Sequence, residues 1–175
     1  MLGFRDQPVD PYRRPFYLAV EKRYSKYKPF CLGSVPRHHN MLAWQRDFFH
    51  LYGNDSATGF SGCRRFSFVF HSELSHDSNQ LLALADADLC DHLAALEAAG
   101  HFRRAAVVLM SDHGPRFDDD FARSRRTSTS GKYEERLPFL AVRLPPDYAR
   151  RHPDRVRNLL RNAAADRLTT AFDLH

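Results

Sequence analysis

The sequence predicts an α/β fold with a mostly parallel sheet. Residues 65–71 and 105–110 have the apolar patterns of β-strands, and residues 78–99 between them have helical periodicity. A strand, a helix and a second strand in this order favour a right-handed crossover between parallel strands. We therefore expect both strands to lie in one parallel sheet.

Residues 1–62 are predicted to form an irregular and helical lead-in within the domain. The first 36 residues are rich in Pro, Tyr and Arg, with a short helical candidate at 16–27. Residues 38–52 carry aromatic and aliphatic side chains at mixed three- and four-residue spacing, which predicts an amphipathic helix. Residues 54–62 are rich in Gly, Ser and Asn and predict a loop.

The central strands and helix have clear local signals. In 65–71 three phenylalanines alternate with other residues, the period of a strand, whereas 105–110 is apolar throughout, as expected for a strand covered on both faces. The 78–99 helix is expected to be capped near Ser75, Asp77 or Ser78 and to end at Gly100. These signals place the centre of the predicted fold in residues 65–110.

The remaining segments complete the predicted fold. Residues 115–132 are polar and predict a long loop, of a kind that is often functional. Residues 139–144 predict another short strand, closed by two prolines. Residues 147–166 predict a basic amphipathic helix that is interrupted near Pro153.

Length and composition limit the possible classes of protein. A chain of 175 residues with 43% hydrophobic content forms one domain or a piece of one. No apolar run approaches the roughly 20 residues that span a bilayer, so no transmembrane segment is expected in this chain. The net charge of +5 is spread over dispersed arginine pairs, which favours a solvated surface and predicts no specific nucleic-acid site. A basic nucleic-acid-binding surface is left open only if these pairs cluster on one face. The oligomeric state is left open.

The three cysteines do not have the spacing of a zinc site. Cys31 and Cys63 lie in loop-like sequence and could pair in an oxidising compartment, and the sequence leaves this open. The first 20 residues contain no apolar signal-peptide core.

The chemistry-bearing motif is Ser111-Asp112-His113-Gly114, directly after the apolar strand. The carboxyl ends of parallel strands are where sites are built in open α/β sheets. Asp112 and His113 offer a carboxylate oxygen and an imidazole nitrogen to one divalent ion, and Gly114 lets the backbone turn sharply. The pair alone leaves open another interpretation, in which Asp112 caps a turn and His113 is an ordinary loop residue.

Four motifs in order carry a resemblance to a known family. They are residues 74–79 with 85–89, 107–114, 131–139 and 168–175. Together they resemble DUF229, a sulfatase-like family of the alkaline phosphatase-like superfamily. The resemblance implies an alkaline phosphatase-like sandwich with a mostly parallel sheet, of which residues 63–175 are the C-terminal half of the core. It also implies a location in the secretory pathway or outside the cell.

The resemblance implies roles for individual residues. Asp112 and His113 would be ligands of a divalent metal ion, either zinc, manganese or calcium, and His76 would be a further ligand or a hydrogen-bond donor to the transferred group. Lys132 and Arg116 would face an anionic ester substrate, although a structural ion pair is left open for each. No catalytic residue is expected in this chain, because the superfamily's nucleophile lies upstream.

These expectations lead to two alternative functions. The first is a fragment of a metal-dependent hydrolase or transferase that acts on phosphate or sulfate esters. The alternative is a non-catalytic sulfatase-like paralogue that serves as an anion-binding or interaction module. Because Asp112, His113 and His76 supply only two or three donors, we expect the chain alone neither to bind a divalent metal tightly nor to hydrolyse these esters.

Overall fold

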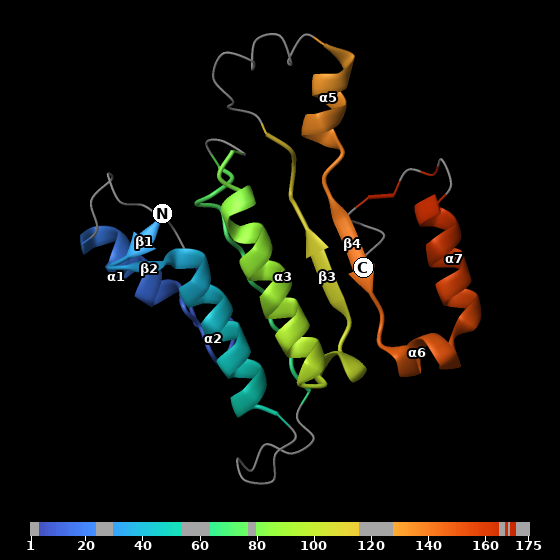
Figure 1. Cartoon of the computed structure of the whole chain (residues 1–175), viewed down its shortest axis with the longest axis horizontal. Coiled ribbons are helices and arrows are strands. Elements are labelled where there is room, and N and C mark those ends of the chain that lie inside the picture. Colours follow the sequence, from blue (N-terminus) through green and yellow to red (C-terminus); the bar gives the residue numbers. More distant parts are fainter. Residues whose placement is uncertain are drawn as a thin grey trace.

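The computed structural model describes residues 4–23, 30–53, 64–76, 80–115, 128–164, 167 and 169–170, which form a mixed helical and stranded fold. Two helices, α2 (Arg37–Leu51) and α3 (Ala83–Ala98), lie side by side (Figure 1). The strands β3 (Val107–Met110) and β4 (Leu140–Arg143) follow α3 on its other side. None of the described helices has the length and apolar character needed to cross a membrane.

The N-terminal part combines two helices with a small antiparallel hairpin. Gly33, with φ of 64°, lies in the turn of this hairpin, a conformation that favours glycine. The two helices confirm the helical predictions for 16–27 and 38–52, and residues 24–29 lie outside the described part. The elements are α1 (Arg14–Arg23), β1 (Cys31–Leu32), β2 (Val35–Pro36) and α2 (Arg37–Leu51).

Helix α3 (Ala83–Ala98) packs against α2 and confirms the predicted central helix. It ends at Gly100, whose φ of 81° is the left-handed conformation expected there, and a short 3₁₀ helix, η2 (His101–Arg103), follows. The start of α3 lies five residues later than predicted. Its N-cap is Leu82, without a side-chain cap, so the predicted cap by Ser75 is wrong; residues 77–79 lie outside the described part.

The larger sheet consists of two antiparallel strands. Strand β3 (Val107–Met110) pairs with β4 (Leu140–Arg143), and Val108 lies opposite Val142. Both strands confirm predicted strands. The sheets in the described residues are antiparallel and two-stranded, so the expected parallel pairing of 65–71 with 105–110 is not found there.

The prediction of a strand at 65–71 is wrong for a physical reason. The segment alternates between exposed and less exposed residues, but no described strand pairs with it. Its polar side chains hold it to α2 instead: the Arg65 guanidinium donates to the Phe49 carbonyl at 2.8 Å, and the Gln45 amide donates to the Ser67 hydroxyl at 3.0 Å. Phe66, Phe68 and Phe70 are 80%, 73% and 64% exposed. A strand requires ladder partners as well as an alternating pattern.

The C-terminal part contains three helices. Helix α5 (Thr129–Arg136) begins inside the predicted loop 115–132, so the end of that prediction is wrong. The Ser128 hydroxyl caps α5 by accepting from the Gly131 amide at 3.1 Å. Residues 116–127 lie outside the described part. Helices α6 (Pro146–Arg151) and α7 (Pro153–Ala164) confirm the predicted helix with its break near Pro153.

Burial is concentrated around α2 and α3. One face of β3 lines an open apolar groove of about 380 Å³ against α3, through Val107 and Leu109. On its opposite face Val108 and Met110 are 44% and 51% exposed. The described part of the chain therefore covers one face of this sheet and leaves the other open. The buried apolar residues are Val20, Leu42, Leu74, Leu96 and Phe102.

Candidate functional site

The predicted metal pair begins where the pairing of β3 and β4 ends. The Ser111 amide donates to the Phe139 carbonyl at 3.0 Å, and the Phe139 amide donates to the Ser111 hydroxyl at 2.9 Å. Ser111 thus extends the strand pairing by one residue. Its backbone hydrogen bond fixes the point at which Asp112 leaves the sheet.

The side chains of Asp112 and His113 face each other. The His113 ring Nδ1 lies 2.7 Å from the Gly114 carbonyl, which can only accept, so Nδ1 carries the hydrogen. In the neutral ring Nε2 then has a free lone pair, and it lies 3.6 Å from Asp112 Oδ2. The other carboxylate oxygen, Oδ1, accepts from the His113 amide at 3.0 Å. The side chains are 63% and 37% exposed, so solvent and ions reach both.

Gly114 joins this turn to helix α5. Its amide donates to the Glu135 carbonyl at 2.9 Å. A Cβ atom at position 114 would lie 1.9 Å from the Glu134 carbonyl oxygen, so no other residue fits. Gly114 does not have positive φ. The glycine of the motif is therefore required by the close approach of two backbones.

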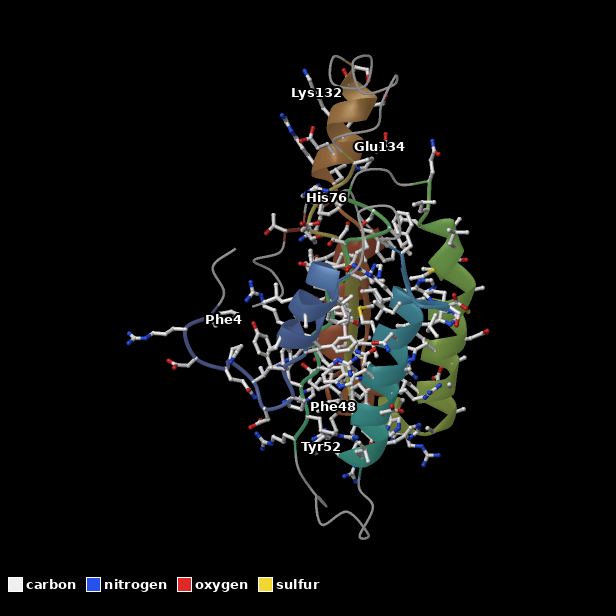
Figure 2. All side chains as sticks on the ribbon, turned by 90° about the vertical axis from the view of Figure 1, so that its left-hand side faces the viewer. Phe4, Phe48, Tyr52, His76, Lys132 and Glu134 are labelled. Atoms are coloured by element: carbon white, nitrogen blue, oxygen red, sulfur yellow. The ribbon has the colours of Figure 1, made fainter. Side chains whose placement is uncertain are left out.

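His76 and Lys132 lie at the same end of the molecule as this turn. Figure 2 shows Lys132 and Glu134 on α5 with His76 just below this helix, and Figure 1 shows α5 beyond the end of β3. Both His76 and Lys132 are exposed. His76 does not join Asp112 and His113 in a three-donor cluster within the described residues. Arg116 lies outside the described part, so its predicted role stays a prediction. Cys63 lies outside it too, so the pairing of Cys31 with Cys63 stays open.

A second group, the His38–His39–Asp88 cluster, was not foreseen from the sequence. His38 and His39 lie in the first turn of α2, and Asp88 lies on α3. The two Nε2 atoms lie 2.8 and 2.6 Å from the same oxygen, Asp88 Oδ2. Their hydrogen bonds lower the pKa of the Asp88 carboxyl. In the described residues this group brings three metal-ligating atoms within 4.8 Å of one another.

Polar residues surround this cluster on the side of the core. Arg37 is buried and pairs with Glu73 at 3.5 Å. His71 lies beside His38, with ring centroids 6.2 Å apart, and its Nε2 lies 3.4 Å from Glu73 Oε2. Burial lowers the pKa of His71, and Glu73 acts in the opposite direction. Glu73 is therefore the acidic partner of both Arg37 and His71 beside the cluster.

The whole chain matches a family model. Residues 1–175 match the model of the family described as "Protein of unknown function (DUF229)". No curated protein matches the chain, and no solved structure matches it.

Proposed function

The chain belongs to the DUF229 family, and we propose that it is the C-terminal half of a metal-dependent hydrolase or transferase that acts on phosphate or sulfate esters. Asp112 and His113 are the metal ligands in this proposal. The observation that carries it is the orientation of the His113 ring. Its Nδ1 is held by the Gly114 carbonyl at 2.7 Å, which leaves Nε2 free beside the Asp112 carboxylate. Histidine ligands are commonly oriented by such a hydrogen bond to a backbone carbonyl.

The separation of the two donors suits a shared ion. Two ligands of a tetrahedral zinc ion lie about 3.3 Å apart, since each ligand lies about 2.0–2.1 Å from the metal. His113 Nε2 and Asp112 Oδ2 are 3.6 Å apart, so a small side-chain rotation brings the two atoms to the separation of about 3.3 Å. A divalent ion bound there would stabilise negative charge on the ester oxygens and lower the pKa of a nucleophile.

The attachment of α5 supports a role for Lys132 in binding the anion. The backbone contact of Gly114 with α5 fixes this helix relative to Asp112 and His113. Lys132 is exposed on α5, at the end of the molecule where His76 also lies (Figure 2). In the proposal Lys132 attracts the negatively charged ester, and His76 donates a hydrogen bond to the transferred group.

The open face of the sheet supports the idea of a half-domain. Val108 and Met110 on β3 are 44% and 51% exposed, and Phe66, Phe68 and Phe70, which lie outside this sheet, are at least 64% exposed, although such side chains are usually covered. We propose that further strands cover this face and complete an alkaline phosphatase-like sandwich with a mostly parallel sheet. Those strands would supply the nucleophile and the remaining carboxylate ligand.

A non-catalytic function is the second candidate. It is favoured by the small number of donors at the pair and by the exposure of Asp112, which is 63%. Two protein donors alone bind a divalent ion weakly, which disfavours metal-dependent turnover. Sequencing the transcript upstream of Met1 distinguishes the two: an in-frame acidic residue and a Thr or Ser nucleophile there favour the enzyme.

Paramagnetic manganese tests the metal pair directly. We expect Mn²⁺ at about 1 mM, a concentration suited to a two-donor site, to broaden the amide NMR signals of residues 111–114. Asp112→Asn should abolish this broadening. The control is Asp91→Asn, which removes an exposed carboxylate from α3 and should leave it unchanged. Equal broadening of these signals in the wild type and in Asp112→Asn would exclude Asp112 as a ligand.

An activity assay tests whether this chain is only a half-domain. We expect no hydrolysis of p-nitrophenyl phosphate or p-nitrophenyl sulfate by the chain alone, with or without added metal, because no nucleophile is assigned to it. Hydrolysis that Asp112→Asn removes would show a complete enzyme and refute the half-domain proposal.

A further inference from the structure

We propose that the His38–His39–Asp88 cluster is a zinc-binding site between α2 and α3. The proposal is independent of the function proposed for Asp112 and His113, because the two groups share no residue. Two imidazole nitrogens and one carboxylate oxygen form a donor set that suits Zn²⁺ and similar divalent transition metals. With three protein ligands, a fourth coordination position remains for water.

The geometry of the cluster is close to that of a bound ion. Both Nε2 atoms face Asp88 Oδ2, at 2.8 Å from His38 and 2.6 Å from His39. The three donor atoms lie within 4.8 Å of one another. Around zinc, neighbouring ligand atoms lie about 3.3 Å apart. To bind zinc, the Asp88 oxygen therefore has to move away from the two nitrogens by only a fraction of an ångström. All three donor atoms can then face one ion.

The three proposed ligands differ in their exposure to solvent. The His38 side chain is 9% exposed, so the protein interior fixes its ring. His39 and Asp88 are 46% and 34% exposed, which gives them room to rotate and leaves a path from solvent. One fixed ligand and two adjustable ligands allow an ion to enter without separating α2 from α3.

The local charge makes Asp88 the decisive ligand. The positive end of the α2 helix dipole lies at His38 and His39 and opposes a cation. With neutral imidazoles the cluster carries the single negative charge of Asp88, while Arg37 is paired with Glu73. Binding also requires each Nε2 to give up its hydrogen, either to Nδ1 of the same ring or to solvent. Removing the charge of Asp88 should therefore weaken zinc binding strongly.

The test is zinc binding by the full chain, measured by calorimetry and by thermal unfolding. We expect one zinc per chain and a rise in Tm with zinc. His39→Gln and Asp88→Asn should each weaken zinc binding by at least about 10–100-fold. Losing even an outer-shell partner, which only orients a ligand, costs this much, and both residues are direct ligands in the proposal. Both residues are partly exposed, and asparagine has the shape of aspartate, so circular dichroism should show folded variants.

Matched controls separate this site from other histidines and from the Asp112–His113 pair. His50→Gln removes an exposed histidine of the same helix, whose Nδ1 lies 3.3 Å from His101 Nε2, and should leave zinc binding unchanged. Asp112→Asn should also leave it unchanged. The proposal is overturned if the wild type binds no zinc, if His39→Gln and Asp88→Asn bind it as the wild type does, or if only Asp112→Asn loses it.

The zinc-binding test of the cluster does not depend on the manganese test of Asp112 and His113. Broadening at residues 111–114 reports on Asp112 and His113, whereas zinc affinity in the Asp88→Asn variant reports on the cluster. Each proposal can therefore fail while the other holds. A tight zinc site here would also revise the sequence-based expectation of weak metal binding, which counted only Asp112, His113 and His76 as donors.

Discussion

Replacing Gly114 with alanine tests how the Asp112–His113 turn is held. The added Cβ would lie 1.9 Å from the Glu134 carbonyl oxygen and 2.8 Å from its carbon. These are backbone atoms, so no side-chain rotation relieves the contact. The backbone of α5 has to retreat by about 1.5 Å to restore ordinary van der Waals contact. This movement breaks the hydrogen bond from the Gly114 amide to the Glu135 carbonyl.

The expected loss of stability follows from these two effects. Steric overpacking costs about 1–3 kcal/mol, and a lost hydrogen bond costs about 0.5–1.5 kcal/mol. We therefore expect Gly114→Ala to destabilise the attachment of α5 by about 1.5–4.5 kcal/mol. The effect should be local, because the buried apolar residues lie in other parts of the structure, including α2 and α3.

Hydrogen exchange is the appropriate assay. Protection of the amides in α5 should fall in Gly114→Ala, while that of α3 changes little. Gly33→Ala is the control: Gly33 has positive φ, but a Cβ there meets no atom within 4 Å. That variant should lose about 1–2 kcal/mol from backbone strain alone, without loosening α5. Unchanged protection of α5 in Gly114→Ala would refute the argument that the backbone contact holds the turn.

Three further predictions concern the exposed phenylalanines, His92 and α5. Phe66→Ser with Phe68→Ser should change the free energy of unfolding by less than about 0.5 kcal/mol, since both side chains are exposed, but should reduce self-association in sedimentation experiments. Burial lowers the pKa of His92, and the charge of Arg46 acts in the same direction. The neutral His92 ring therefore stabilises the fold fully above the unfolded-state pKa of about 6.5, and this contribution is lost as the pH falls through the folded-state pKa. In denaturant titrations at several pH values, His92→Gln should show a shallower loss, and an equal loss would exclude His92 as the cause. Ser128→Ala should weaken α5 by about 0.5–2 kcal/mol, seen as faster exchange of its amides.

Elements with a strong local pattern could be predicted from the sequence. Helices α2 and α3 have apolar residues at helical spacing, and α3 ends at a glycine in the left-handed conformation. The break between α6 and α7 follows from Pro153, which cannot continue a helix. In each case the determining residues lie within one or two helical turns of each other.

Helix α5 was missed because its signals are weak and lie in a polar stretch. The capping signal was present: Ser128 lies three residues before Gly131, and its hydroxyl accepts a hydrogen bond from the Gly131 amide. The helix has only eight residues, and much of its attachment comes from the backbone of Gly114, a contact that no sequence pattern reports. Short helices of this kind depend on tertiary contacts more than on propensity.

The two candidate sites differ in the same way. Asp112 and His113 are adjacent, so their proximity could be predicted from the sequence. The approach of Asp88 to His38 and His39 depends on how α2 packs against α3, about fifty residues apart. A pair of adjacent histidines gives no indication of its partner until the helix packing is known. The cluster could therefore be found only in the structure.

The wrong strand prediction at 65–71 has a physical explanation that also bears on the proposed half-domain. An alternating pattern such as Phe66, Phe68 and Phe70 indicates an extended segment, but a strand forms only when a neighbour supplies ladder hydrogen bonds. In the structure this segment forms no strand, is held to α2 by Arg65 and Ser67, and pairs with no described strand. The phenylalanines suit a buried face that the described residues do not cover. The same side chains therefore explain the failed prediction and support the proposal that further strands complete this domain.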